Sequence, residues 1–422
     1  MLKLGLFFVV IFSLSYISAH ERKLSTYVNP GCSLPPGSTR TCDDLLLVHI
    51  RSEGASDTLH HIWDFSRHPS LMLALTEKNS SLRVDWPAYV GAGAHSVSFT
   101  SRPLYVISVV VAGIIEFNDT DDSGAMRDAT NQESRLIGID GVQWRLVQPI
   151  TNDSNTVLMA VEAQLANHTD ANGTAPVQIT MGAFGGEKRD SDLPHMLHSS
   201  NMSQMDITLD HLPPTYPRSR FGVSLLAATS DPGNATLRYA DTRNIDDEYA
   251  PGVFKMVELL SSGVKSQKFE LLDDDDDSSN SSSEIQYGGY VQWRPVVYTA
   301  PSRDDSQATR SVHYGIAACC SDLSQLRHML PYKLFGNDSD VAYQMTNVTF
   351  GQPEDGFYNK TRFASWTFVV GIGSPAEETL SSFVMHMVLL GLGLPLVLVV
   401  LGMLCITVRR LIQNKDDFFL SQ

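Results

Sequence analysis

The chemically reactive pattern that recurs most often in this sequence is Asn-x-Ser/Thr, in which the asparagine amide can accept an N-linked glycan. Chance would place Ser or Thr two positions after an asparagine in roughly one case in six, yet eleven of the sixteen asparagines stand in this pattern. The sequence therefore predicts a heavily N-glycosylated protein that passes through the secretory pathway. The eleven candidate glycan sites are Asn79, Asn118, Asn152, Asn167, Asn172, Asn201, Asn234, Asn280, Asn337, Asn347 and Asn359.

Four cysteines are disulfide candidates, because a secretory compartment is oxidising: Cys32, Cys42, Cys319 and Cys320. The fifth, Cys405, lies in an apolar stretch near the C-terminus, where packing or acylation is its expected role. A bond between the adjacent Cys319 and Cys320 would close a strained ring. We therefore expect both to pair with Cys32 and Cys42, in either order, and so to tie the N-terminal segment to the second half of the chain. A zinc site is the alternative, which the compartment and the spacing disfavour.

Common catalytic motifs are missing from the sequence. It contains no Gly-x-Ser-x-Gly elbow, no His-Glu-x-x-His zinc motif and no Gly-x-x-x-x-Gly-Lys phosphate loop. Asp119, Asp121, Ser123 and Gly124 match the start of a calcium loop, but Thr130 occupies the twelfth position, where such a loop needs glutamate. We therefore expect no catalytic, cofactor or metal site and no enzymatic activity.

The densest acidic cluster in a patterned region is Asp246, Asp247 and Glu248, followed by Tyr249. Two carboxylates about 5 to 10 Å apart across a groove would suit glycoside hydrolysis, which makes a hidden hydrolase one interpretation. The simpler interpretation is that these acids precede Pro251 and stabilise the positive end of a helix. We favour the helix, because apolar residues at helical spacing follow: Val253, Met256, Val257 and Leu260.

Two pairs of histidines invite comparison with metal sites. His60 and His61 are adjacent in an alternating segment, so their rings point to opposite faces and cannot share a metal ion. His195 and His198 lie in a polar stretch, where two ligands alone make a poor site. We expect all four rings to be exposed or half-buried. Protonation of the 13 histidines in an acidic compartment would offset most of the formal charge of −16, but we favour ordinary surface histidines over an association switch.

The two ends of the chain predict a single-pass membrane protein. Residues 1–19 hold one lysine, an apolar run and small residues before a polar one, as a cleavable signal peptide does. Residues 383–408 carry no charge and are long enough to cross a hydrocarbon core of about 30 Å. Acidic residues precede this span, whereas Arg409 and Arg410 follow it, so we expect the tail, residues 409–422, in the cytosol. The chain then contacts membrane lipid, and it is not basic enough to bind nucleic acid.

Apolar residues that alternate with period two predict a mainly β fold between these ends. The alternating segments are Leu82–Trp86, Val142–Leu146, Val157–Leu165, Val177–Ala183 and Met205–Leu209. Leu104–Ile115 is apolar throughout but too short to cross a membrane, so we expect a buried strand. Short strands separated by turn residues are typical of β-sandwiches. Besides the helix after Pro251, we expect one in which Ser321 caps a leucine-rich turn, from Leu323 to Leu330, that ends before Pro331.

The expected luminal part, residues 20–382, exceeds the size at which one core usually stops growing. We therefore expect two β-sandwich-like luminal domains, residues 20–190 and 191–382, with the boundary in the polar stretch 185–201. Residues 273–283 are five aspartates followed by serines and one asparagine. This segment cannot bury apolar surface, so we interpret it as a solvated loop between strands, with a weak calcium tract as the alternative.

Several segments resemble the glycosylated lysosomal membrane protein family. Its two signature blocks resemble Arg243–Phe254, which reads RNIDDEYAPGVF, and Val291–Val296, which reads VQWRPV. Shorter segments match in the same order: Leu59–Trp63, Val84–Trp86, Ile115–Asn118, Ser219–Gly222 and Asn347–Gly351. The resemblance covers nearly the whole chain after the signal peptide. It implies a type I lysosomal membrane glycoprotein without enzymatic role, which acts as an accessory subunit and shields a multi-pass lysosomal transporter of the major facilitator superfamily from luminal proteolysis.

The cytosolic tail departs from the family pattern, which ends in a tyrosine-based sorting signal. Residues 411–422 contain no tyrosine and end in DDFFLSQ. The alternative interpretation is a cell-surface receptor or adhesion protein, which sandwiches, glycans and a short tail would suit equally well. Within the span, Gly391, Gly393 and Gly402 would let another helix approach closely, and Pro395 would bend it.

Overall fold

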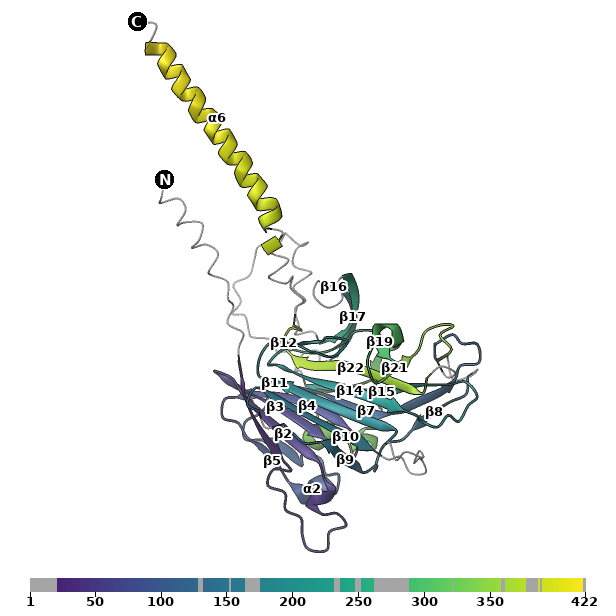
Figure 1. The fold of residues 1–422 in the computed structure, drawn as a ribbon. Coiled ribbons are helices and arrows are strands. Elements are labelled where there is room, and N and C mark those ends of the chain that lie inside the picture. The colour runs from purple at the N-terminus through teal and green to yellow at the C-terminus, as the bar shows by residue number, and fades with distance from the viewer. Residues whose placement is uncertain are drawn as a thin grey trace. The chain divides into compact units, whose positions relative to one another are not determined.

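The computed structural model describes residues 21–127, 132–151, 153–163, 175–230, 236–246, 252–261, 288–320, 322–357, 361–376, 386–387 and 389–419. The chain divides into two units. The first, called the β unit below, comprises the described residues up to 242 and from 255 to 376. The second comprises those of 243–254 and 377–422, including the C-terminal helix. The expectation of a mainly β protein with few short helices and one long C-terminal helix is confirmed (Figure 1).

Antiparallel strands build the first layer of the β unit. They pair in the order β1-β2-β3-β4-β7-β15-β21-β20, and β8 pairs with the later half of β7. The bounds of these strands are β1 Lys23–Val28, β2 Leu47–Glu53, β3 Asp57–Asp64, β4 Ser70–Glu77, β7 Tyr105–Asn118, β8 Ser134–Ile137, β15 Ser219–Ser230, β20 Ala308–Ala318 and β21 Val341–Phe350.

The second layer has the order β9-β10-β11-β14-β22-β18-β17. A short strand, β19, pairs with both β22 and β20, so the two layers belong to one continuous hydrogen-bonded ladder. The remaining strand of this ladder is β16. The bounds are β9 Trp144–Gln148, β10 Thr156–Ala163, β11 Val177–Phe184, β14 Met202–Asp210, β16 Arg238–Asp246, β17 Gly252–Leu260, β18 Gly289–Trp293, β19 Val296–Tyr298 and β22 Phe363–Ile372.

The remaining elements are short hairpins, short helices and the C-terminal helix. Two short hairpins are formed by β5 Leu82–Val84 with β6 Val97–Phe99 and by β12 Lys188–Arg189 with β13 Leu197–His198. The short helices are α2 Trp86–Val90, α3 Leu330–Phe335 and the 3₁₀ turns η2 Cys42–Asp44, η4 Asp305–Gln307 and η5 Leu323–Leu326. A π-helical turn, η6 Leu389–Gly393, leads into the long helix α6 Leu394–Phe419.

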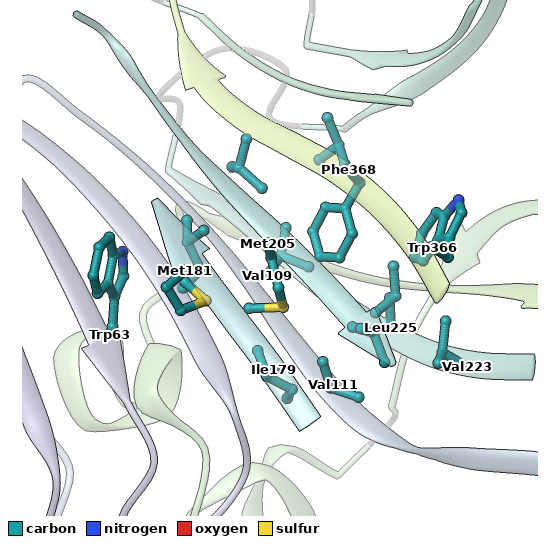
Figure 2. Packing of buried hydrophobic residues seen from close by; sticks show 14 of the residues in the cluster. Trp63, Val109, Val111, Ile179, Met181, Met205, Val223, Leu225, Trp366 and Phe368 are labelled. Carbon is teal, nitrogen blue, oxygen red and sulfur yellow. The ribbon is translucent and has the colours of Figure 1, made fainter. Parts of the chain in front are cut away.

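One hydrophobic cluster draws residues from both layers. Trp63 comes from the first layer, while Met181, Met205 and Phe368 come from the second (Figure 2). The period-two pattern of Met205–Leu209 therefore points into this core, as expected. Burial of so many large apolar side chains is the main favourable term in folding.

The expected boundary near residue 190 falls inside this layered structure. Strand β11 lies before that boundary and β14 after it, yet Ile179 pairs with Ile207 in one ladder. Strands from both expected luminal domains thus share the second layer, and their apolar faces share one core. The β unit accordingly holds described residues from both sides of residue 190 in a single compact unit.

Strand β7 confirms the interpretation of Leu104–Ile115 as a buried strand. It pairs with β4 on one edge and with β15 on the other. Val109 contributes to the core between the layers, and Val110 contributes to a second cluster with Leu226. A strand buried on both faces needs a continuous apolar run, which explains why its sequence does not alternate.

The first of the two expected short helices is wrong, and the second is shorter than expected. Residues Gly252–Leu260 form strand β17, in which Val257 pairs with Trp293. Both faces of the later half of this strand are buried, so apolar residues occur on both of them. Some of these residues therefore also match the spacing expected of a helix. Leu323–Leu326 is a 3₁₀ turn capped by Asp322, and Pro331 lies in the first turn of a separate helix, which it helps to begin. Pro251 and Ser321 lie outside the described residues.

The second unit contains the expected membrane span. Leu390–Arg410 is a helical stretch of 21 residues with mean hydropathy 2.5, long and apolar enough to cross a membrane. Pro395 lies in the first turn of α6, directly after the π-helical turn. The signal peptide, residues 1–19, lies outside the described residues.

A buried ion cluster joins two loops to the start of β15. Arg220 has no exposed side-chain surface; its Nε donates to Asp119 Oδ2 at 2.5 Å, and its Nη2 lies 2.8 Å from Asp355 Oδ1 and also contacts Asp122. Burial opposes ionisation of Asp119 and Asp355, but backbone donors and the guanidinium outweigh it and lower both pKa values. Their stabilising effect is present above the unfolded pKa of about 3.9 and is lost only as the pH falls through the lower folded value.

Three of the short segments that carry the family resemblance meet at this cluster. Glu116 of β7 accepts hydrogen bonds from Ser219 Oγ and from Arg135 Nε, both at 2.6 Å. Gly351, just after β21, has a φ of +133°, and a Cβ there would lie 2.0 Å from Arg220 Nη1. Only glycine fits beside the guanidinium in that conformation.

Histidines lie inside the first layer, so the expectation of exposed or half-buried rings is wrong for His60 and His61. Both are fully buried, on opposite faces of β3. His60 Nδ1 lies 2.9 Å from His49 Nε2, whereas His61 Nδ1 lies 2.8 Å from Ser203 Oγ of the second layer. Burial lowers the pKa of His49 to about 4, that of His60 to about 2 and that of His61 to about 3. These three rings therefore do not offset the negative charge of the chain at mildly acidic pH.

We predict that Arg220→Met lowers the free energy of unfolding by about 3–5 kcal/mol, because it leaves Asp119 and Asp355 buried without their cation. Arg218→Met is the control: Arg218 is exposed, so the loss should stay within about 0.5 kcal/mol. Denaturant unfolding of the purified proteins measures both values. Equal stability of the two variants would contradict a structural role for the cluster.

We predict that His61→Gln weakens the pH dependence of stability. An unfolded histidine binds a proton below a pKa of about 6.5, whereas the folded ring stays neutral, so folding with a buried His61 costs about 1.6 kcal/mol more at pH 5 than at pH 6.5. Glutamine can bond Ser203 but does not titrate. Denaturant unfolding at both pH values should reveal a smaller loss of stability in the variant than in the unmodified protein. An unchanged loss in His61→Gln contradicts this account.

Candidate functional site: a polar cleft on the second layer

Five of the eleven candidate glycan sites lie among the described residues, and their surroundings differ. Asn79 and Asn337 are exposed, and Asn201 and Asn347 are half-buried. Asn118 is only 9% exposed, and its Nδ2, the atom that would carry a glycan, donates a hydrogen bond of 2.9 Å to a glutamate carboxylate. The other six lie outside the described residues: Asn152, Asn167, Asn172, Asn234, Asn280 and Asn359.

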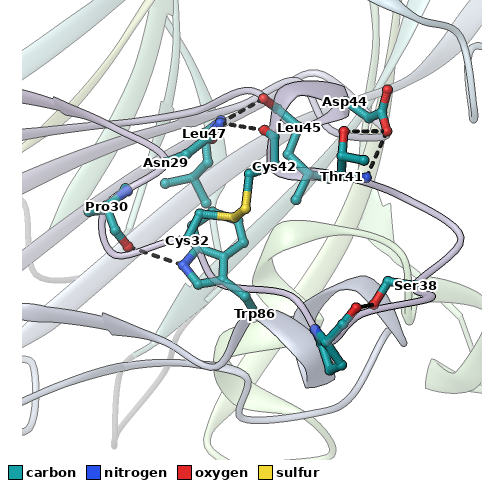
Figure 3. The surroundings of a disulfide bond; sticks show 11 residues. Asn29, Pro30, Cys32, Ser38, Thr41, Cys42, Asp44, Leu45, Leu47 and Trp86 are labelled. Carbon is teal, nitrogen blue, oxygen red and sulfur yellow. Dashed lines mark hydrogen bonds between the residues drawn. A yellow bond between two sulfur atoms is a disulfide. The ribbon is translucent and has the colours of Figure 1, made fainter.

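The expected pairing of the cysteines is wrong. Cys32 is bonded to Cys42, with Cα atoms 6.1 Å apart, and Cys319 is bonded to Cys320. A turn at Asn29 folds the N-terminal segment back, and Asn29 Nδ2 donates a hydrogen bond of 3.0 Å to the Cys42 carbonyl (Figure 3). The first disulfide therefore closes a local loop and does not tie this segment to the second half of the chain. The sequence did not predict this bond, because it does not show that a turn brings Cys32 close to Cys42.

The other candidate residues do not converge on a site. Asp246 belongs to β16, but Asp247 and Glu248 lie outside the described residues, as does the acidic loop 273–283. Asp119, which opens the apparent calcium loop, serves the ion cluster instead and also accepts hydrogen bonds from Ser123. Across the described ranges, no three His, Cys, Asp or Glu side chains are placed to hold a metal ion.

A cleft of about 710 Å³ lies on the face of the second layer that points away from the core. Side chains alternate along a strand, so β14 buries Met205 in the core and directs Gln204 and Asp206 toward the cleft. Thr180 of β11 joins them, and the β12–β13 hairpin and residues 301–303 also line the space. The volume lies within the range of small-molecule sites.

A hydrogen-bond network fixes the polar floor of the cleft. Gln204 Nε2 donates to Asp190 Oδ2 at 2.8 Å and to Asp206 Oδ2 at 3.1 Å. Since both partners are carboxylates, this atom must be the amide nitrogen, and the amide oxygen faces His198 Nε2 at 2.8 Å. His198 therefore carries its proton on Nε2. Burial lowers the pKa of His198, which favours this neutral ring, and its Nδ1 has no hydrogen-bond partner among the described residues.

Arg303 connects the cleft floor to the hairpin beside it. Its Nη2 donates to Asp206 Oδ1 at 3.1 Å and to Ser365 Oγ at 3.0 Å, while its Nη1 donates to the Leu193 carbonyl at 2.9 Å. Arg303 and Asp206 therefore form an ion pair within the protein. Besides histidines, the charged residues that line the cleft are three cations and three carboxylates: Lys188, Arg189, Arg303, Asp190, Asp192 and Asp206.

An aromatic pair lies beside this network. The rings of Phe184 and His198 are stacked, with centroids 3.5 Å apart and planes inclined by 10°. His198 is only 4% exposed, so the expectation of an exposed or half-buried ring is wrong for it, whereas the half-buried His195 agrees with that expectation. The cleft was missed because the polar positions of an alternating strand usually face water. Only the hairpin that covers Gln204 and Asp206 distinguishes these from ordinary surface residues.

Known proteins of one family are similar to this chain over most of its length. The model of the glycosylated lysosomal membrane protein family matches residues 46–413. A glycosylated lysosomal membrane protein of Danio rerio is 28% identical over 409 residues, which cover 93% of this chain and 90% of the relative. The Homo sapiens protein of the same name is 25% identical over 367 residues and covers 83% of this chain and 80% of its own length.

A solved structure of a putative mutarotase from Salmonella typhimurium covers 80% of this chain and 97% of its own length, at 9% identity. Its TM-score of 0.27 is too low to indicate a shared fold. The family model, by contrast, extends over both layers and the membrane helix and contains the segments that meet at Arg220. The chain belongs to the glycosylated lysosomal membrane protein family.

Proposed function

We propose that this protein is a non-enzymatic accessory subunit that stabilises a multi-pass lysosomal transporter of the major facilitator superfamily and protects it from luminal proteolysis. The observation that carries the proposal is the combination of one compact β unit with one apolar helix in a member of this family. A multi-pass transporter exposes short loops to luminal proteases. A folded, glycan-covered neighbour can shield them.

The topology supports this role. The acidic residues before the span and Arg409 and Arg410 after it favour a cytosolic tail and a luminal β unit. Gly391, Gly393 and Gly402 have open space where a Cβ would project, and such small residues allow close packing of a second membrane helix. The span is thus suited to lie beside a transporter helix.

The β unit is suited to resist proteolysis. Proteases cut segments that unfold locally, whereas about half of the described residues of this unit belong to paired strands. The buried Arg220 cluster also keeps its carboxylates ionised at acidic pH. Glycans at Asn79 and Asn337 would add cover where the described surface is exposed.

We predict that deletion of residues 21–376, with the signal peptide and span retained, lowers the steady-state abundance of the partner transporter severalfold. Inhibitors of luminal proteases should restore it, because the loss arises from cleavage. A second variant replaces Phe383–Val408 by an unrelated span and should lower co-purification of the transporter from mild detergent. Immunoblotting measures both effects, with the unmodified chain as control.

If both variants leave the abundance of the transporter unchanged, the accessory role is wrong. Microscopy of the tagged chain addresses the alternative. Persistent location at the plasma membrane without lysosomal overlap would favour a cell-surface receptor or adhesion protein, and the tail without tyrosine makes this test necessary.

We also predict that the described glycan sites differ in occupancy. Ser81→Ala and Ser339→Ala remove the acceptor patterns of the exposed Asn79 and Asn337, and each should shift gel mobility by one glycan. Thr120→Ala removes the pattern of Asn118 and should cause no shift, because Asn118 Nδ2 is engaged with Glu133. An equal shift in all three variants would contradict the ranking by exposure.

A further inference from the structure

The cleft of the second layer has the properties of a binding site for a small polar molecule. It is already formed in the folded chain, at about 710 Å³, and it is lined by a hairpin, a loop and the floor of a sheet. Gln204 and Asp206 are 6% and 7% exposed, yet they are polar. Buried polar groups need partners, and here each has them within one connected network.

The charge arrangement narrows the class of ligand. Asp206 is paired with Arg303 at 3.1 Å, and Asp190 Oδ2 lies 3.7 Å from His198 Nε2. Cations and carboxylates are equal in number around the space, so it has no excess charge with which to hold an anion or a cation. A neutral ligand enters without leaving an unpaired charge buried.

The hydrogen-bonding capacity favours a ligand with several hydroxyl groups. Asp190 and Asp206 are carboxylates, which offer about four acceptor positions each, and the network uses only some of them. Lys188 and Arg189 at the hairpin add donors. A hydroxyl group both donates and accepts, so a polyol can use both kinds of partner at once.

Apolar surface in the same space suits the carbon face of a ring. Leu158 and Phe184 line the cleft together with the polar residues, and the Phe184 ring is stacked flat on the ring of His198. A pyranose has one face of C–H groups and a rim of hydroxyl groups. This combination matches apolar and polar groups that lie side by side.

We propose that this cleft binds a neutral pyranose sugar, either free or as a unit of an N-linked glycan. Asp190 and Asp206 accept from its hydroxyl groups, the hairpin donors bond its oxygens, and the apolar patch packs on its C–H face. The proposal does not depend on the accessory role described above, since its test measures sugar binding and not the abundance of a transporter.

The test uses the full-length protein in a detergent without sugar groups, before and after enzymatic removal of its N-glycans. Saturation-transfer NMR titrations with glucose, galactose, mannose and N-acetylglucosamine should give saturable binding of at least one sugar. Binding before deglycosylation identifies free or foreign sugar as the ligand. Binding only after deglycosylation identifies the protein's own glycan as the occupant.

Two variants connect binding to the cleft. Asp190→Asn removes a charged acceptor and should weaken binding at least about tenfold. Ser302→Trp places a large ring into the cleft from an exposed position and should abolish binding, whereas Ser306→Trp, four positions on and outside the cleft, should leave it unchanged. Thermal unfolding of each variant confirms folding, and Ser302→Trp decides the question if Asp190→Asn does not fold.

Two results would overturn the proposal. One is the absence of saturable sugar binding to the deglycosylated full-length protein. The other is binding that Ser302→Trp leaves intact, which would place the sugar elsewhere. Saturable binding of inorganic phosphate or glycine in place of the sugars would assign the cleft to charged ligands instead.

Discussion

The fold of the β unit depends on the enclosure of one guanidinium. Arg220 begins the long central strand β15, and three carboxylates reach it from the loop after β7 and the loop after β21. A buried cation without partners would cost several kcal/mol, so these loops must close over it for the strands to pair as they do. The same constraint fixes Gly351, where any side chain would collide with Arg220. Residues more than 200 positions apart are thus held by one group.

The length and alternation of apolar segments predicted several features of the fold correctly. The membrane span, the buried β7 and the core side of Met205–Leu209 follow from hydrophobic length and alternation, which a chain displays wherever it folds. Strand β17 was missed because burial on both faces removes the alternation. The cysteine pairing was missed for two reasons. Ring strain argued against a bond between the adjacent Cys319 and Cys320, and the sequence does not show which cysteines the fold brings close together. The partner of β17 lies in a distant part of the sequence, whereas both disulfides join cysteines that are close in the sequence.

Strand β14 illustrates the same limit within one element. Its alternation correctly assigned Met205 to the core and left Gln204 and Asp206 for the opposite face. On most antiparallel sheets that face meets water and its polar residues carry no further meaning. Here the hairpin β12–β13 and Arg303 cover it, so ordinary polar positions become a network with fixed donors and acceptors. The candidate site therefore depends on the hairpin and Arg303, and their position over β14 arises from the tertiary fold.

Acidity destabilises the Arg220 cluster and the buried histidines of the first layer in different pH ranges. The carboxylates around Arg220 have lowered pKa values, so their stabilising effect persists until the pH falls below about 4. The neutral histidines of the first layer lose stability earlier, from about pH 6.5 downward, because the unfolded chain gains protons that the folded rings refuse. In a mildly acidic compartment the ion cluster therefore keeps its full stabilising effect, whereas the buried neutral histidines carry a cost in stability. A member of a lysosomal family can carry that cost only if other interactions, among them this cluster, supply a sufficient margin of stability.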